Sequence, residues 1–131
     1  MGGRVAMGLC GAVVAAVIVA SPALATTESV FVGSWVSVDT DGSHQELSVR
    51  GSGRGGYAVQ VVDWGASICG GGVATVSGAG RADGTVLDMV GTLACRGGGN
   101  VLRSRVTIEF AYDTATGTLT DQFGVVWWRG A

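Results

Sequence analysis

Apolar and polar residues alternate along most of the chain after residue 30, which is the pattern of strands with one buried and one exposed face. In residues 102–112, Val106, Ile108 and Phe110 share one parity, and charged or hydroxyl-bearing residues share the other. Glycine-rich segments separate such runs, and none of the runs has the period of an amphipathic helix. The pattern predicts strands at 31–39, 44–50, 57–64, 73–80, 85–95, 102–112, 118–120 and 125–129.

The connections between these predicted strands are short. Asp41-Gly42 and Asp83-Gly84 are typical of hairpin turns, because glycine adopts positive φ freely. Eight strands joined by short turns favour an antiparallel up-and-down meander that closes into a small barrel, since closure removes the unpaired edges. A β-sandwich is the alternative all-β fold.

The first 25 residues differ from the rest. Residues 5–20 form an uncharged apolar run, which is shorter than the roughly 20 residues that span a membrane. Ala23-Leu24-Ala25 follows with the small-x-small form that a signal peptidase accepts. The sequence therefore predicts a signal peptide at 1–25 and a single domain at 26–131. We expect that domain to be extracellular or associated with the cell envelope, without a stable membrane anchor after cleavage.

The charge of the chain argues against several kinds of partner. Seven of the eight basic residues and all ten acidic residues follow position 25, so the predicted domain has a net charge of −3. A mildly acidic chain without a basic run is a poor binder of nucleic acid or anionic membranes.

Residues 51–56 match G-x-G-x-x-G, but a strand is predicted after them where a dinucleotide site needs a helix. We expect no cofactor.

The sequence also gives no catalytic or metal-binding pattern. His44 is the single histidine, and a catalytic triad would need it beside a nucleophile and an orienting acid. Residues 39–43 resemble the start of a calcium loop, but the twelfth position, which must be glutamate in an EF-hand, is Arg50. We therefore predict a turn at 39–43, no metal site and no enzymatic activity.

Two cysteines remain after the predicted signal peptide, Cys69 and Cys95. In an exported protein an even pair indicates a disulfide. If Asp83-Gly84 turns a hairpin, the two cysteines lie near its open end, and residues 70–72 supply the slack that lets them join. Closing this loop should stabilise the fold by roughly 3–4 kcal/mol in the chain-entropy model.

The first and last predicted strands carry a resemblance to a known group. Gly33-Ser34-Trp35 resembles the G-x-W that opens the first strand of lipocalins, and a similar opening occurs in avidins, which belong with them to the calycin superfamily. In that superfamily a late arginine or lysine packs over the first-strand tryptophan, and Arg129 is the matching residue here. The resemblance covers only these two ends of the chain. It implies a barrel closed by Gly33, Trp35 and Arg129.

These observations favour a secreted, non-catalytic binding protein with a small apolar or amphipathic ligand in a lipocalin-like barrel. The alternative is an exported interaction or inhibitor module that contacts a protein partner through its loops and exposed aromatic residues. Tryptophan and tyrosine are enriched at such contacts. The candidate binding surface consists of Tyr57, Trp64, Trp127 and Trp128.

Overall fold

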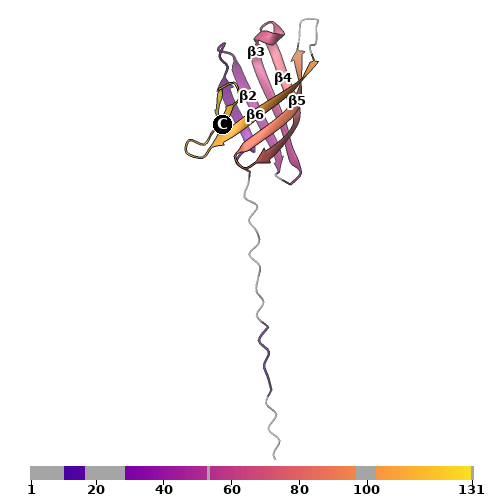
Figure 1. Ribbon diagram of the computed structural model, residues 1–131, viewed down its shortest axis with the longest axis vertical. Coiled ribbons are helices and arrows are strands. Elements are labelled where there is room, and N and C mark those ends of the chain that lie inside the picture. Colours follow the sequence, from indigo (N-terminus) through magenta and orange to yellow (C-terminus); the bar gives the residue numbers. More distant parts are fainter. Residues whose placement is uncertain (1–10, 17–28, 53, 97–102, 131) are drawn as a thin grey trace, which may run out of the picture.

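The computed structural model describes residues 11–16, 29–52, 54–96 and 103–130. Residues 11–16 form no regular secondary structure, and the remaining described residues form an all-β domain (Figure 1). Its elements are β1 (Gly33–Val38), β2 (His44–Ser52), β3 (Gly56–Ala66), the 3₁₀ helix η1 (Ser67–Cys69), β4 (Gly72–Asp83), β5 (Val86–Arg96), β6 (Arg103–Asp113), β7 (Thr118–Asp121) and β8 (Val126–Arg129).

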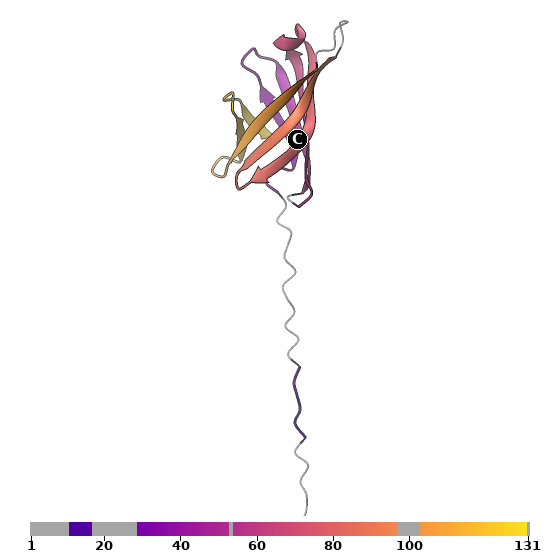
Figure 2. The same cartoon turned by 45° about the vertical axis from the view of Figure 1, so that its right-hand side comes forward.

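The eight strands close into one antiparallel barrel. Each strand pairs with the next in sequence, and β8 returns to pair with β1 through Trp35 opposite Arg129 and Val36 opposite Trp128. Figures 1 and 2 show the strands tilted and curved around a common axis. The predicted up-and-down barrel is confirmed, and the closed strand order excludes the sandwich. Every predicted strand is present, and the boundaries differ by a few residues.

The turn between β4 and β5 differs by one residue from the prediction. Asp83 pairs with Val86, so the two turn residues are Gly84 and Thr85, and not Asp83-Gly84. Gly84 has a φ of +57°, as the first central residue of a type II′ hairpin requires. Counting back from this turn, Cys95 faces Ala74 on β4.

The middle of the same hairpin depends on two glycines that face each other. Gly78 on β4 lies opposite Gly91 on β5, and a Cβ built on Gly78 would approach the Gly91 Cα to 2.5 Å. A Cβ on Gly91 would lie 2.7 Å from the carbonyl oxygen of Ser77. Because both distances are too short for a side chain, glycine is required where these two strands approach so closely.

The barrel has two ends of different character. The closed end carries the β2–β3, β4–β5 and β6–β7 connections, and it is filled by aromatic side chains. Phe31, which precedes β1, makes edge-to-face contacts with Tyr57 and Tyr112 at ring-centroid distances of 6.3 Å each. Trp35 contacts Tyr112 in the same way at 6.5 Å. Other side chains buried in the core include Leu47, Val49, Leu87, Met89, Phe110 and Leu119.

Candidate functional site

The opposite end of the barrel contains a cavity of about 450 Å³. We call this the open end; it carries the β1–β2 turn, η1 and the β7–β8 turn. The volume lies within the roughly 300–1,000 Å³ of typical small-molecule sites. Its apolar lining residues are Val61, Ala66, Ile68, Ala74, Val76, Leu93, Val106, Ile108, Phe123, Val125 and Trp127. Its polar lining residues are Asp39, Thr40, Gln45, Asp63 and Asp121.

The apolar wall follows from the alternation within the strands. Val61 on β3 pairs with Val76 on β4, and Val76 pairs with Leu93 on β5. These three side chains therefore project inward at neighbouring positions around the barrel. They are shorter than the aromatic side chains of the closed end. Medium-sized residues at these inward positions leave the interior of the open end unfilled.

Trp127 separates the cavity from the packed core. Its side chain is buried, and its ring contacts Phe110 edge-to-face at 5.9 Å. The indole Nε1 donates a hydrogen bond to Asp121 Oδ2 at 3.1 Å. Trp127 thus forms part of the cavity lining with its polar edge already satisfied.

The carboxylates at the cavity are held by local hydrogen bonds. Asp63 accepts from Gly65 N–H at 3.0 Å and from Gln45 Nε2 at 3.2 Å. Asp121 Oδ1 accepts from the backbone N–H groups of Phe123 and Val125, which fixes the β7–β8 turn. These bonds fix the positions of the two carboxylates.

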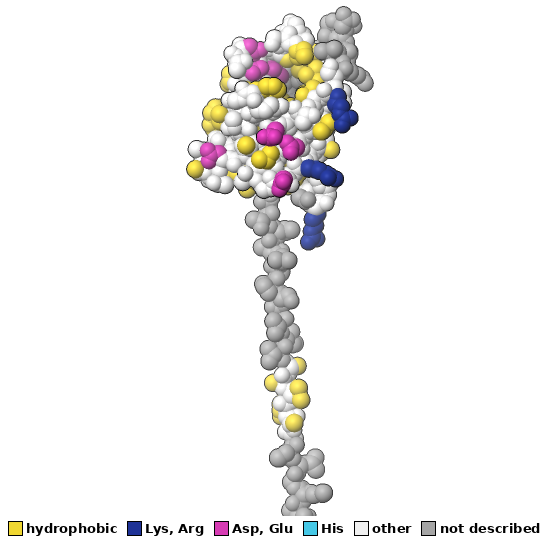
Figure 3. Space-filling view, in the orientation of Figure 1, with side chains coloured by type: hydrophobic (Ala, Val, Ile, Leu, Met, Phe, Trp, Pro, Cys, Tyr) yellow, Lys and Arg dark blue, Asp and Glu magenta, His cyan; other side chains and the backbone are white. Residues whose placement is uncertain are grey.

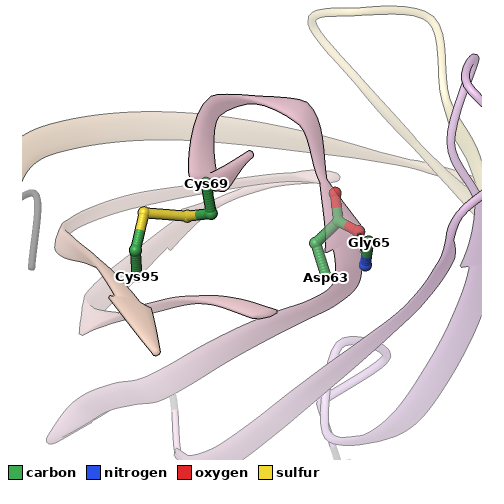
Figure 4. The surroundings of a disulfide bond; sticks show 4 residues. All are labelled: Asp63, Gly65, Cys69 and Cys95. Atoms are coloured by element: carbon green, nitrogen blue, oxygen red, sulfur yellow. Dashed lines mark hydrogen bonds between the residues drawn. A yellow bond between two sulfur atoms is a disulfide. The ribbon is translucent and has the colours of Figure 1, made fainter. Parts of the chain in front are cut away.

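A disulfide fastens one side of the open end (Figure 4). Cys69 of η1 is joined to Cys95 of β5 with a Cα–Cα distance of 5.4 Å, which confirms the predicted pairing. Figure 4 also shows Asp63 and Gly65 on the neighbouring strand β3. Because η1 also carries Ile68, the disulfide holds an exposed apolar side chain at the cavity wall.

At the seam between β1 and β8, the structure brings Gly33, Trp35 and Arg129 together. The Arg129 guanidinium carbon lies 3.9 Å from the centroid of the Trp35 ring. Arg129 also donates to the carbonyl oxygen of Val32 at 2.6 Å and to that of Val30. Trp35 Nε1 donates to the carbonyl oxygen of Phe31 at 2.9 Å. The seam therefore anchors the segment that carries Phe31 across the closed end.

The glycine at position 33 has a steric role in this cluster. Its φ is +132°, a conformation that residues with a side chain rarely adopt. A Cβ at this position would lie 2.7 Å from Arg129 Nη1. The G-x-W spacing thus places a residue without a side chain where the guanidinium approaches the backbone of β1.

The four aromatic residues of the candidate binding surface lie in two different environments. Tyr57 and Trp127 are buried, because Tyr57 packs against Phe31 and Trp127 packs against Phe110. Trp64 and Trp128 are each 52% exposed on the outer wall, on β3 and β8. Of the four residues, the cavity lining includes only Trp127.

The residues around the cavity were largely missed by reasoning from the sequence. The sequence pattern around Asp39 resembles a calcium loop and does not indicate a ligand cavity, and no motif surrounds Asp63 or Asp121. Their one shared feature is position, because each lies at or near the end of a strand that reaches the open end. His44 is exposed and lies 3.5 Å from Glu46 on the same strand.

Comparisons with known proteins do not assign this chain to a family. None of the family models, curated proteins or solved structures compared with this chain matches it. Within the described ranges, no group of three or more His, Cys, Asp or Glu residues is arranged to hold a metal ion. Among the same residues, no helix is long and apolar enough to cross a membrane.

Proposed function

We propose that this protein is a non-catalytic binding protein that holds a small apolar or amphipathic molecule in the open end of its barrel. The observation that carries the proposal is the cavity of about 450 Å³, which has an apolar wall and a few polar groups. Sites for small molecules generally combine these features, because apolar contacts supply affinity and a few polar groups fix orientation. An eight-stranded barrel is wide enough to hold one such ligand.

The proposal includes membership of the calycin superfamily and export from the cell. The G-x-W at residues 33–35 and the packing of Arg129 over Trp35 support the first part. The disulfide supports the second, since disulfides persist in oxidising compartments. Both parts agree with a carrier or scavenger of small molecules outside the cytoplasm.

The test is a titration with N-phenyl-1-naphthylamine, an uncharged apolar probe whose fluorescence rises in apolar surroundings. We expect saturable binding to the intact domain with a stoichiometry near one. Ala74→Phe places a ring in the cavity, because Ala74 is buried in its lining. This substitution should weaken binding by on the order of tenfold or more, since a filled site loses the apolar contacts of the probe.

The matched control is Ala82→Phe, which adds the same ring to the same strand. Ala82 is exposed near the β4–β5 turn, at the closed end. The Ala82→Phe variant should bind N-phenyl-1-naphthylamine as tightly as the unchanged domain does. Circular dichroism and thermal unfolding establish that both variants fold. Equal binding by a folded Ala74→Phe variant would place the probe outside the cavity and reject the proposal.

A second candidate function is a protein-interaction module, and the exposure of Trp64 and Trp128 favours it. Their half-exposed indoles on the outer wall are suited to a protein contact. The double variant Trp64→Ala/Trp128→Ala should then lose a specific partner in affinity capture from envelope extracts. It should keep binding of N-phenyl-1-naphthylamine. Unchanged recovery of every captured partner would reject a role for these two residues.

A further inference from the structure

We infer that the ligand of this cavity carries a hydrogen-bond donor of positive charge, such as a protonated amine, on an apolar body. The inference rests on the proposed function, because it concerns the same cavity. It follows from the kinds of polar atom that the cavity lining presents and from the charges around it.

The first observation is the sign of the charge at the lining. Three carboxylates reach the cavity from different parts of the fold, namely Asp39 after β1, Asp63 on β3 and Asp121 at the end of β7. The described lining residues include no arginine, lysine or histidine to neutralise them. A ligand that enters the open end therefore meets a field that attracts cations and repels anions.

The second observation is the balance of donors and acceptors. The side-chain donors of the lining already have partners, because Gln45 Nε2 donates to Asp63 and Trp127 Nε1 donates to Asp121. The Thr40 hydroxyl lies 3.4 Å from Asp39 Oδ1 and donates to it. With these side-chain donors already paired, the polar groups that the lining offers are carboxylates, each of which can accept further hydrogen bonds. A ligand rich in donors complements them.

The third observation separates an organic cation from a metal ion. The carboxylates do not form a metal-binding group within the described residues. They are held by separate hydrogen bonds, Asp63 through Gly65 and Asp121 through its turn. The apolar wall beside them has no role in binding a bare ion, but it fits the hydrocarbon part of an amphipathic amine.

Three arginines of the barrel lie together away from this cavity. A second depression lies on the wall toward the closed end, and its lining includes Arg50, Arg54 and Arg81. In Figure 3 arginine side chains project from the right-hand edge of the barrel, whereas carboxylates lie over its top and middle. Arg96 ends β5 and Arg103 begins β6 on the side of the open end, and Arg96 is not among the residues that line the cavity.

The test compares three eight-carbon probes by isothermal titration calorimetry at neutral pH, namely octylammonium, octanol and octanoate. The apolar body is the same in all three, so differences in affinity report the polar group. We expect octylammonium to bind tightest, octanol next and octanoate weakest. The dissociation constants of octylammonium and octanoate should differ by on the order of tenfold or more, as the Coulomb energy of a close charge pair implies.

Asp63→Asn supplies the matched variant. The asparagine oxygen can still accept from Gly65, and the unpaired amide oxygen of Gln45 can accept from the new amide after a flip of its own amide group. The fold should therefore persist without the charge. We expect octylammonium binding to weaken by roughly tenfold and octanol binding to stay unchanged. Asp83→Asn, at the exposed end of β4 beside the β4–β5 turn, is the control and should change the affinity for neither probe.

Two outcomes separate this inference from the proposed function. If N-phenyl-1-naphthylamine fails to bind the intact domain, the proposed function falls and this inference falls with it. If that probe binds, but octanoate binds as tightly as octylammonium or octylammonium does not bind at all, only the inference about charge is rejected. An equal loss of octylammonium and octanol in Asp63→Asn would show that Asp63 shapes the cavity and does not select a cation.

Discussion

The two ends of this barrel are built from the same eight strands, yet they use the interior differently. At the closed end, Phe31, Trp35, Tyr57 and Tyr112 form edge-to-face contacts and are largely removed from water. At the open end, inward positions carry valine and leucine, and a cavity of about 450 Å³ remains. The difference indicates that one end is densely packed, whereas the other leaves the space in which we propose that a ligand binds.

The means of holding the two ends also differ. The closed end is held by packing and by the Arg129 contacts with Trp35 and the carbonyl of Val32. The open end has a disulfide and hydrogen-bonded carboxylates in place of a filled core. A covalent link suits a wall that must keep its shape beside a cavity, because packing there contributes less.

The largest expected effect comes from truncating one leucine at each end. Leu87 and Leu93 lie on β5 and face inward, but Leu87 is fully buried near the closed end and Leu93 lines the cavity. Leu87→Ala should lower the free energy of unfolding by about 3–5 kcal/mol, as for buried leucines in other cores. Leu93→Ala should cost less than about 1.5 kcal/mol, because it removes fewer contacts. Urea denaturation measures both values.

This pair bears directly on the comparison between the ends. Similar losses for Leu87→Ala and Leu93→Ala would mean that the open end is packed as well as the closed end. The assignment of a binding cavity would then fail together with the contrast between the two ends.

The next effect concerns the disulfide. Replacing both Cys69 and Cys95 by alanine should lower the free energy of unfolding by about 3–4 kcal/mol, because the bond closes a loop with a sequence separation of 26. Amide hydrogen exchange should rise first around η1, at the open end. A uniform rise over the whole barrel would show instead that the disulfide supports both ends equally.

The smallest effect tests the seam. Arg129→Ala should cost about 1–2 kcal/mol, because it loses the contact with Trp35 and the hydrogen bond to Val32. Arg105→Ala, on the exposed face of β6, should stay within about 0.5 kcal/mol. Thermal unfolding of the two variants gives the comparison. Equal losses would mean that Arg129 does not hold the closed end.

Much of the fold could be predicted from the sequence because its signals are local. Alternation with period two marks each strand, and turn residues mark the connections between them. Cys69 and Cys95 could be paired because both lie near the open end of one hairpin. Gly33, Trp35 and Arg129 could be grouped because Gly33-Ser34-Trp35 resembles the opening of lipocalins, and that resemblance implies a late arginine packed over the tryptophan.

The candidate site was harder to predict, because the free space inside the barrel depends on the combined size of side chains from several strands. Inward positions are apolar at both ends, so alternation alone does not show which half is filled. The burial of Tyr57 depends on its contact with Phe31, which lies just before β1, and only the folded barrel brings these two rings together. Asp63 and Asp121 become neighbours of one cavity only when the barrel closes.

The short seam between β1 and β8 also has a consequence for the order of folding. Most contacts in a meander join neighbours in sequence and form quickly, whereas the hydrogen bonds of Arg129 to Val32 and Val30 span 97 and 99 residues. Closing so long a loop carries a large entropy cost, so we expect the seam to form last. Since β8 follows every other strand, a growing chain remains an open, curled sheet until residues 126–129 have been synthesised. Both sheet edges stay unpaired until then, which makes this interval the period of greatest risk of aggregation.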